Sequence, residues 1–218
     1  MWTRRFVFLF PALLLAQTPP SVKATGTATV YAQPDKAELT VGVVTQSASA
    51  QAAADQNATS TTAMLSALKA VLGVNGTIQT VGYSISPRYS NTNPPSIIGY
   101  TASNTVHVTT VNLNQVGPLI DAAHRAGAND VSGITFGLQD PEPIMRQALG
   151  KASKTALAHA SAIAQGLGLQ TGAILSAQEG ATVTPVRSDF KVAAAATPVE
   201  TGTVSVSATV TVQVAIAP

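Results

Sequence analysis

Residues 203–216 read TVSVSATVTVQVAI, and this stretch decides the class of fold. Valine, alanine or isoleucine occupies each even position from 204 to 216, while threonine, serine or glutamine occupies the odd positions from 203 to 213. A period of two places alternate side chains on opposite faces of a β-strand. We therefore predict a strand with one buried face and one hydroxyl-rich face, the latter either wet or packed against a partner.

Further strands are predicted at residues 25–32, 36–45, 78–89, 97–111, 131–138 and 172–178. In the strand at 78–89, we expect Val81, Tyr83 and Ile85 to alternate inward. The Asn- and Pro-rich residues 91–96 separate this strand from the next, so the pair should form a hairpin. Asn104 interrupts the apolar face of the second strand, where we expect it to satisfy backbone groups.

Three helices are predicted, at residues 49–72, 113–126 and 141–167. Ser47 or Ser49 is a suitable cap for the first, and Asp140 before Pro141 for the third. The apolar stripe of the first helix consists of Thr61, Met64, Leu65, Leu68, Val71 and Leu72. The stripe of the third consists of Met145, Leu149, Ala152, Ala156, Ala160, Ile163 and Leu167. Because alanine dominates the third stripe, that helix should pack closely on its partner.

The predicted order of elements is β-β-α-β-β-α-β-α-β-β. Hairpins mixed with helices indicate an α+β fold, a largely antiparallel sheet with helices packed on one side. Residues 181–201 include Pro185 and Pro198 and show no clear period, so we interpret them as a surface excursion. Two intertwined subdomains are an alternative to one domain, the first five elements forming one and the rest the other.

The first 16 residues have the pattern of a signal peptide. Arg4 and Arg5 precede an apolar run at 6–16, which is too short to span a bilayer, and Ala16 offers a small residue for cleavage. A retained N-terminal anchor is the alternative. We predict a signal peptide at 1–16, a linker at 17–24 and the folded domain at 25–218, with no transmembrane helix after cleavage.

The composition excludes several classes of function. Without Arg4 and Arg5 the chain has ten basic and ten acidic residues, so the exported form is near neutral. It has no run of basic residues, which argues against nucleic acid as a partner. It has no cysteine, which excludes disulfides, thiolate nucleophiles and zinc–cysteine sites.

No catalytic constellation emerges from the sequence. There is no G-x-S-x-G motif, and His107, His124 and His159 are far apart along the chain. Asp140 and Glu142 are two residues apart, but a helix cap explains Asp140 better than a metal site does. We therefore predict no catalytic residue, no metal and no cofactor, with a hydrolase of dispersed site as the less favoured alternative.

The hairpin offers the candidate binding surface, formed by Arg88, Tyr89 and Tyr100. The two tyrosines flank its loop, and aromatic residues together with arginine are frequent in binding sites. The residue types also serve turns and strand pairing, so a role in the fold is the alternative.

A series of short sequence motifs, in order along the chain, resembles the SIMPL-domain family, which includes bacterial periplasmic immunogenic proteins. The resemblance covers about residues 25–216. Each motif alone is weak evidence, and their order and spacing together make the resemblance specific. The motifs are Pro34-Asp35, Gly42-Val43, Asn57, Ser86-Pro87-Arg88-Tyr89, Gly99-Tyr100-Thr101-Ala102-Ser103-Asn104, Gly127-Ala128, Ile134-Thr135-Phe136, Ala152, Ala156, Ala160, Leu167-Gly168 and Pro198-Val199-Glu200-Thr201-Gly202. Thr201 departs from the family, which often has proline there.

The resemblance implies an exported or envelope-associated protein, in a family with members linked to oxidative stress or known as immunogenic. It carries over no catalytic residue, and similar proteins are expected to self-associate. The leading hypothesis is a non-enzymatic protein of the periplasm or outer membrane that forms a homo-oligomer or binds other envelope proteins. The alternative is a monomeric module that binds a ligand or peptide at the hairpin.

Overall fold

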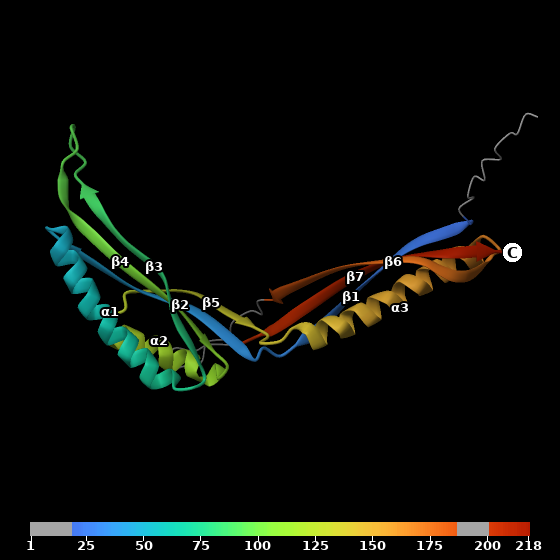
Figure 1. Cartoon of the computed structure of the whole chain (residues 1–218), viewed down its shortest axis with the longest axis horizontal. Coiled ribbons are helices and arrows are strands. Elements are labelled where there is room, and N and C mark those ends of the chain that lie inside the picture. Colours follow the sequence, from blue (N-terminus) through green and yellow to red (C-terminus); the bar gives the residue numbers. More distant parts are fainter. Residues whose placement is uncertain (1–18, 187–200) are drawn as a thin grey trace, which may run out of the picture.

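The computed structural model describes residues 19–186 and 201–218 and has the predicted order of elements (Figure 1). The predicted signal peptide therefore lies outside the described residues. The α+β prediction is confirmed, with two antiparallel sheets in place of one. The strands are β1 (Ser21–Ala32), β2 (Lys36–Ser47), β3 (Gly76–Tyr89), β4 (Ile97–Thr110), β5 (Asp130–Gly137), β6 (Gln170–Val186) and β7 (Thr203–Ala217). The helices are α1 (Ala50–Leu72), the 3₁₀ turn η1 (Leu113–Gln115), α2 (Val116–Arg125) and α3 (Glu142–Gly166).

The three-stranded sheet, here called sheet A, has the order β1-β7-β6. Its central strand is β7, whose even positions from Val204 to Val214 are at most 6% exposed. The alternation predicted for this strand is confirmed. The first strand pairs with the last in antiparallel register, Ser21 opposite Ala215 and Ala32 opposite Val204, so sheet A joins parts of the chain that are distant in sequence.

Helix α3 covers one face of sheet A, mainly over β1 and β7. Its contact side is a line of fully buried alanines at a spacing of four, from Ala148 to Ala164. At Gly26 of β1 a side chain would overlap the Ala152 carbonyl oxygen and the Ala156 amide nitrogen, so the helix backbone lies directly on the strand. The close packing predicted from the alanines is confirmed.

The apolar stripe of α3 was predicted incorrectly at its C-terminal end. Ile163 is 43% exposed and Leu167 is 63% exposed. Each residue turns the helix by about 100°, so residues four apart differ in direction by about 40°. The buried alanines therefore wind slowly around the helix axis and continue from Ala160 to Ala164. Ile163 lies to one side of this line of alanines, away from sheet A.

The four-stranded sheet, here called sheet B, has the order β3-β4-β2-β5 and is covered on one face by α1 and α2. The core between them contains larger side chains than the core of sheet A. Its members include Leu39, Val41, Val43, Met64, Leu68, Val106, Val108 and Leu119. Helix α1 begins after Ser49, whose Oγ accepts a hydrogen bond from the Ala52 amide at 3.2 Å, and it ends at Gly73 with a positive φ.

A buried asparagine ties α1 to sheet B. Asn57 is fully buried, and its Nδ2 donates to the carbonyl oxygens of Val43 at 2.8 Å and Ala102 at 3.1 Å. The hydroxyl of Thr61 donates to Asn57 Oδ1 at 3.3 Å. The side chain thus joins a helix to two neighbouring strands with all its polar atoms bonded.

Two predictions for the β3–β4 hairpin are wrong. Val81 and Tyr83 are each 58% exposed and Ile85 is 40% exposed, because β3 is an edge strand and α1 packs mainly over β2 and β4. Asn104 does not satisfy backbone groups, since its Oδ1 is buried and has no hydrogen-bond partner. The hairpin itself is confirmed, with a register shift between Thr80 and Gly82.

The strands of sheet A extend beyond their predicted limits. Strand β1 begins at Ser21, before the predicted residue 25, and β6 continues to Val186. Residues 181–186 therefore belong to a strand paired with β7, and only the remainder of the predicted excursion, residues 187–200, lies outside the described residues.

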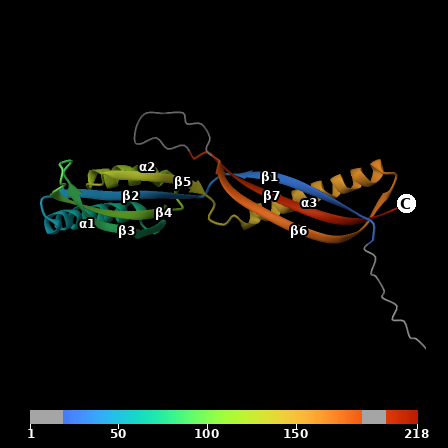
Figure 2. The same cartoon turned by 90° about the horizontal axis from the view of Figure 1, so that it is seen from above.

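The two sheets follow one another in an elongated arch (Figure 1). The helices lie on its convex side, and both sheets turn their helix-free faces to the concave side. Viewed from above, sheet B and sheet A occupy opposite ends of the molecule, with the β1–β2 connection at the bend between them (Figure 2).

Candidate functional site

The predicted binding residues lie at the end of the β3–β4 hairpin that projects from the arch (Figure 1). Tyr89 is 57% exposed and pairs with Ile97, whereas Tyr100 is partly buried and pairs with Pro87. Arg88 is exposed and pairs with Gly99. The two tyrosines flank the loop, but they are not paired with one another across the hairpin.

Strand alternation separates Arg88 from the two tyrosines. Tyr100 shares a face with its partner Pro87, and Tyr89 returns to that same face two residues later. Arg88 lies between Pro87 and Tyr89 and so belongs to the opposite face of the ribbon. The structure brings the tyrosines to one side of the hairpin and places the guanidinium on the other.

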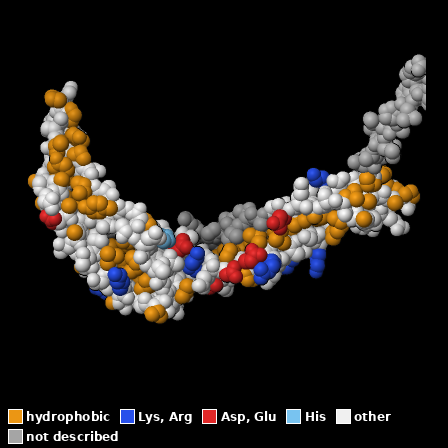
Figure 3. All heavy atoms as spheres, viewed as in Figure 1, with side chains coloured by type: hydrophobic (Ala, Val, Ile, Leu, Met, Phe, Trp, Pro, Cys, Tyr) orange, Lys and Arg blue, Asp and Glu red, His pale blue; other side chains and the backbone are white. Residues whose placement is uncertain are grey.

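The side of the hairpin that carries the tyrosines is apolar and uncovered, and we call it the hairpin face. Its members are Tyr83, Ile85, Tyr89 and Ile97, between 40% and 58% exposed. Figure 3 shows hydrophobic side chains gathered over this projecting part of the molecule. Between Gly76 and Thr110 the sequence contains no acidic residue, and Arg88 is its one Lys or Arg. Exposed apolar surface of this kind marks interaction sites.

A charged cluster lies on the helix-free face of sheet B, near the bend. Lys36 Nζ is 3.0 Å from Glu38 Oε1, and His107 Nε2 is 3.6 Å from Glu38 Oε2. The side chains are about a third exposed, so they face solvent and are accessible to a ligand. The alternation of β2 places Lys36, Glu38 and Thr40 on one face of the strand, and the β2–β4 register brings His107 next to them.

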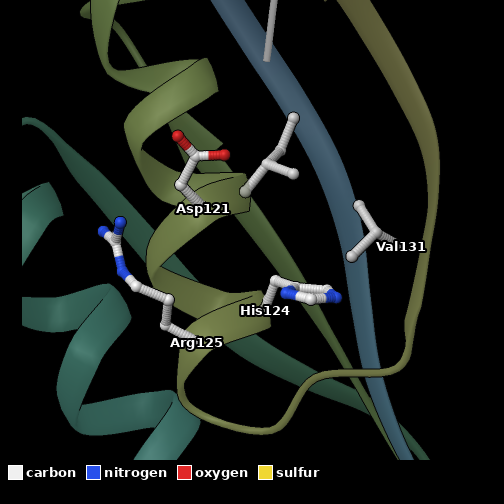
Figure 4. A pocket seen from close by; sticks show the side chains of 5 residues that line it. Asp121, His124, Arg125 and Val131 are labelled. Atoms are coloured by element: carbon white, nitrogen blue, oxygen red, sulfur yellow. The ribbon is translucent and has the colours of Figure 1, made fainter. Parts of the chain in front are cut away.

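A shallow pocket of about 390 Å³ lies between α2 and β5 (Figure 4). Its lining consists of Ile120, Asp121, His124, Arg125 and Val131. The ring of His124 points toward Val131, while Arg125 extends to the other side of the helix. The polar groups therefore do not converge on one point, as a catalytic site or a specific ligand site requires.

The described residues contain no group of three or more His, Asp or Glu that could hold a metal ion. The three histidines are in different surroundings. His107 is beside Glu38, His124 is in the last turn of α2, and His159 Nδ1 is 2.9 Å from the Thr25 carbonyl oxygen. Among the described residues, these histidine contacts are to a carboxylate and a backbone carbonyl, and none is to a hydroxyl group that could act as a nucleophile.

In the part of the chain that the structure describes, every helix is too short or too polar to cross a bilayer.

Comparison with known proteins identifies one family. The family profile described as "SIMPL: Protein of unknown function (DUF541)" matches residues 22–214, nearly the whole described chain.

The similar curated proteins have names that give a cellular location or state that the protein is uncharacterized. The 26 kDa periplasmic immunogenic protein of Brucella melitensis is 28% identical over 74% of this chain and 67% of its own length. The uncharacterized protein YggE of Edwardsiella ictaluri is 30% identical over 72% of this chain and 66% of its own. YggE of Escherichia coli K12 is 28% identical over 72% of this chain and 64% of its own.

Proposed function

Because this chain belongs to the SIMPL family, we propose that it is a non-enzymatic periplasmic protein that works by self-association through the hairpin face. The location is supported by the N-terminal pattern of residues 1–16 and by the printed name of the Brucella relatives. The observation that carries the proposal is the exposed apolar hairpin face, which has no carboxylate between Gly76 and Thr110.

The hairpin face suits a protein partner more than a small ligand. Its side chains form a flat ribbon rather than a cavity, and the outer edge of β3 carries backbone groups that sheet B does not pair. Each Tyr or Ile removed from water contributes favourably in proportion to its buried apolar area. A second copy brings the same face, so the contact is self-complementary about a two-fold axis.

A monomeric ligand-binding module at Arg88, Tyr89 and Tyr100 is less well supported. The alternation of β3 directs Arg88 away from the tyrosines, so the three groups do not surround one ligand. Contact with the outer membrane, binding of other envelope proteins and a part in the response to oxidative stress remain predictions that follow from the family resemblance.

The test compares two double variants of the mature chain purified from the periplasm, by size-exclusion chromatography with light scattering. Tyr83→Glu with Ile85→Glu places two charges on the hairpin face, whereas Ser84→Glu with Ser86→Glu places them on the opposite face of the same strand. We expect wild type and the serine variant to form the same multimer and the Tyr83/Ile85 variant to be monomeric. A monomeric wild type, or equal masses for the two variants, would contradict the proposal.

A further inference from the structure

The concave side of the arch is an extended surface that no helix covers (Figure 1). In sheet A it is the face opposite α3, because Ala24, Gly26 and Val30 are buried toward the helix and the odd positions of β1 point away from it. In sheet B it is the face opposite α1 and α2, because Leu39, Val41 and Val43 are buried beneath them.

Hydroxyl and amide groups dominate this surface in both sheets. In sheet A the strand register places side by side Thr25, Thr27, Thr29, Ser207, Thr209 and Thr211. In sheet B it does the same for Thr40, Gln79, Ser84, Ser103, Thr105 and Thr109. Among the described residues of this face of sheet A, Lys23 is the one charged side chain. In sheet B the same surface carries Lys36, Glu38, Arg88 and Asp130. The surface is therefore nearly uncharged in sheet A, has charges of both signs in sheet B, and is rich in both sheets in groups that donate and accept.

The hydroxyls keep hydrogen-bonding capacity although some of them bond to one another. Thr25 Oγ1 is 2.9 Å from Thr211 Oγ1, and Thr29 Oγ1 is 2.9 Å from Ser207 Oγ. A hydroxyl has one donor and two acceptor positions, so one bond between neighbours leaves positions open on both. Cross-strand pairing also fixes these side chains, which lowers the entropy that a ligand must remove on binding.

An exposed aromatic ring lies on the same surface, close to the bend. Tyr31 is 66% exposed, pairs with Ser205 and follows Thr29 on the hydroxyl-rich face of β1. A short turn separates it from Lys36 at the start of β2, where the Lys36–Glu38–His107 cluster begins. The ring of Tyr31 and the Lys36–Glu38–His107 cluster therefore lie at the bend, where the hydroxyl-rich faces of sheet A and sheet B meet.

The chemistry of this surface argues against three kinds of long ligand. Nucleic acid requires a row of cations, and apolar peptides or lipid require apolar area, neither of which the concave faces offer. The hydroxyl rows and the exposed ring suit an uncharged chain that is itself rich in hydroxyls and presents flat apolar patches of C–H groups to an aromatic ring. A glycan has this chemistry. The twelve residues of β1 extend for about 40 Å, so the surface suits an extended chain.

We propose that the concave surface binds a neutral glycan strand, with Tyr31 stacking on a sugar ring at the bend. Glu38 accepts hydrogen bonds from sugar hydroxyls, and the threonine rows of sheet A and sheet B contact the chain on either side. The proposal does not depend on self-association, because the hairpin face lies on the opposite side of sheet B.

The experiment titrates the mature chain with two defined probes, chitohexaose and cellohexaose, by isothermal titration calorimetry. Both are neutral β-1,4-linked hexasaccharides, and only chitohexaose carries acetamido groups. Binding of both indicates recognition of hydroxyls, binding of chitohexaose alone indicates additional recognition of the amide, and either result supports the proposal. Binding of neither at millimolar concentration overturns it.

Two tyrosine variants locate the site. Tyr31→Ala should weaken binding about tenfold, the usual scale for one aromatic contact, while Tyr83→Ala should leave it unchanged. The two tyrosines are similarly exposed, at 66% and 58%, so the second is a matched control on the hairpin face. Equal effects of the two substitutions would overturn the proposal. So would a change of mass on Tyr31→Ala, since a second copy would then cover this face.

Discussion

Each of the two sheets packs one face against helices, but the side chains at the two contacts differ. Sheet A meets α3 through alanine, valine and glycine, and the helix backbone lies against Gly26 of β1. Sheet B meets α1 and α2 through leucine, methionine and valine, and it holds α1 by the hydrogen bonds of Asn57. The comparison indicates that sheet A depends on close approach of the backbones, whereas sheet B depends on filled volume and one polar anchor.

The largest loss of stability is expected at Gly26, where the backbones of β1 and α3 are in direct contact. Gly26→Val should lower the free energy of unfolding by about 3 kcal/mol or more, because the new side chain overlaps backbone atoms of α3 that cannot move independently. Hydrogen exchange followed by mass spectrometry should show faster exchange in α3 and β7 and unchanged exchange in α1 and β4.

A second glycine in a strand of sheet A serves as a control, because replacing it tests the effect of losing a glycine without a steric clash. Gly180 of β6 has no atom within 4 Å of an added Cβ, so Gly180→Ala should leave stability unchanged or raise it by about 0.5 kcal/mol. If Gly26→Val were as stable as Gly180→Ala, the close approach would not be the feature that holds sheet A.

The second prediction concerns the polar anchor of sheet B. Asn57→Leu removes the donor to the Val43 and Ala102 carbonyl oxygens and should cost about 2 kcal/mol in a urea unfolding experiment. The faster hydrogen exchange should now appear in α1, β2 and β4 and leave α3 protected. The same loss of protection in both sheets would mean that they unfold as one unit and would contradict the division.

The smallest effect is expected at the neighbouring asparagine. Asn104 pairs with Val43 in β2 and with Tyr83 in β3, and its buried Oδ1 has no partner. Asn104→Val removes an unsatisfied polar atom and adds a β-branched side chain to a strand, so stability should stay the same or rise by about 1 kcal/mol. A loss as large as that of Asn57→Leu would show that Asn104 makes an essential polar contact.

Local patterns predicted much of this fold because local geometry determines them. The alternation at residues 203–216 identified the buried face of β7, and the two serines proposed as caps, Ser47 and Ser49, placed the start of α1 to within two residues, with Ser49 as the cap in the structure. The alanines of α3 predicted its close packing before the position of Gly26 against it was known. In each case the physical cause lies within one strand or one helix turn.

The remaining features depend on contacts between distant parts of the chain. The sequence alternation at Val81, Tyr83 and Ile85 is the same whether or not a helix covers these residues. In the structure α1 packs mainly over β2 and β4, so the side chains of the edge strand β3 stay exposed. No local signal pairs β1 with β7, or places His107 beside Glu38. For the candidate site, the sequence identified the aromatic residues of the hairpin but could not show that Arg88 lies on the other face.

The pairing of β1 with β7 also imposes an order of events on folding during synthesis. Strand β1 leaves the ribosome long before its partner, since Ser21 pairs with Ala215 and Ala32 with Val204. Sheet B contains only residues between 36 and 137, so it can form while the later part of the chain is still being made. Sheet A must wait for β7, and such long-range pairing is slow. The waiting β1 has exposed edges and alternating apolar residues, which makes the incomplete chain a natural client for a chaperone.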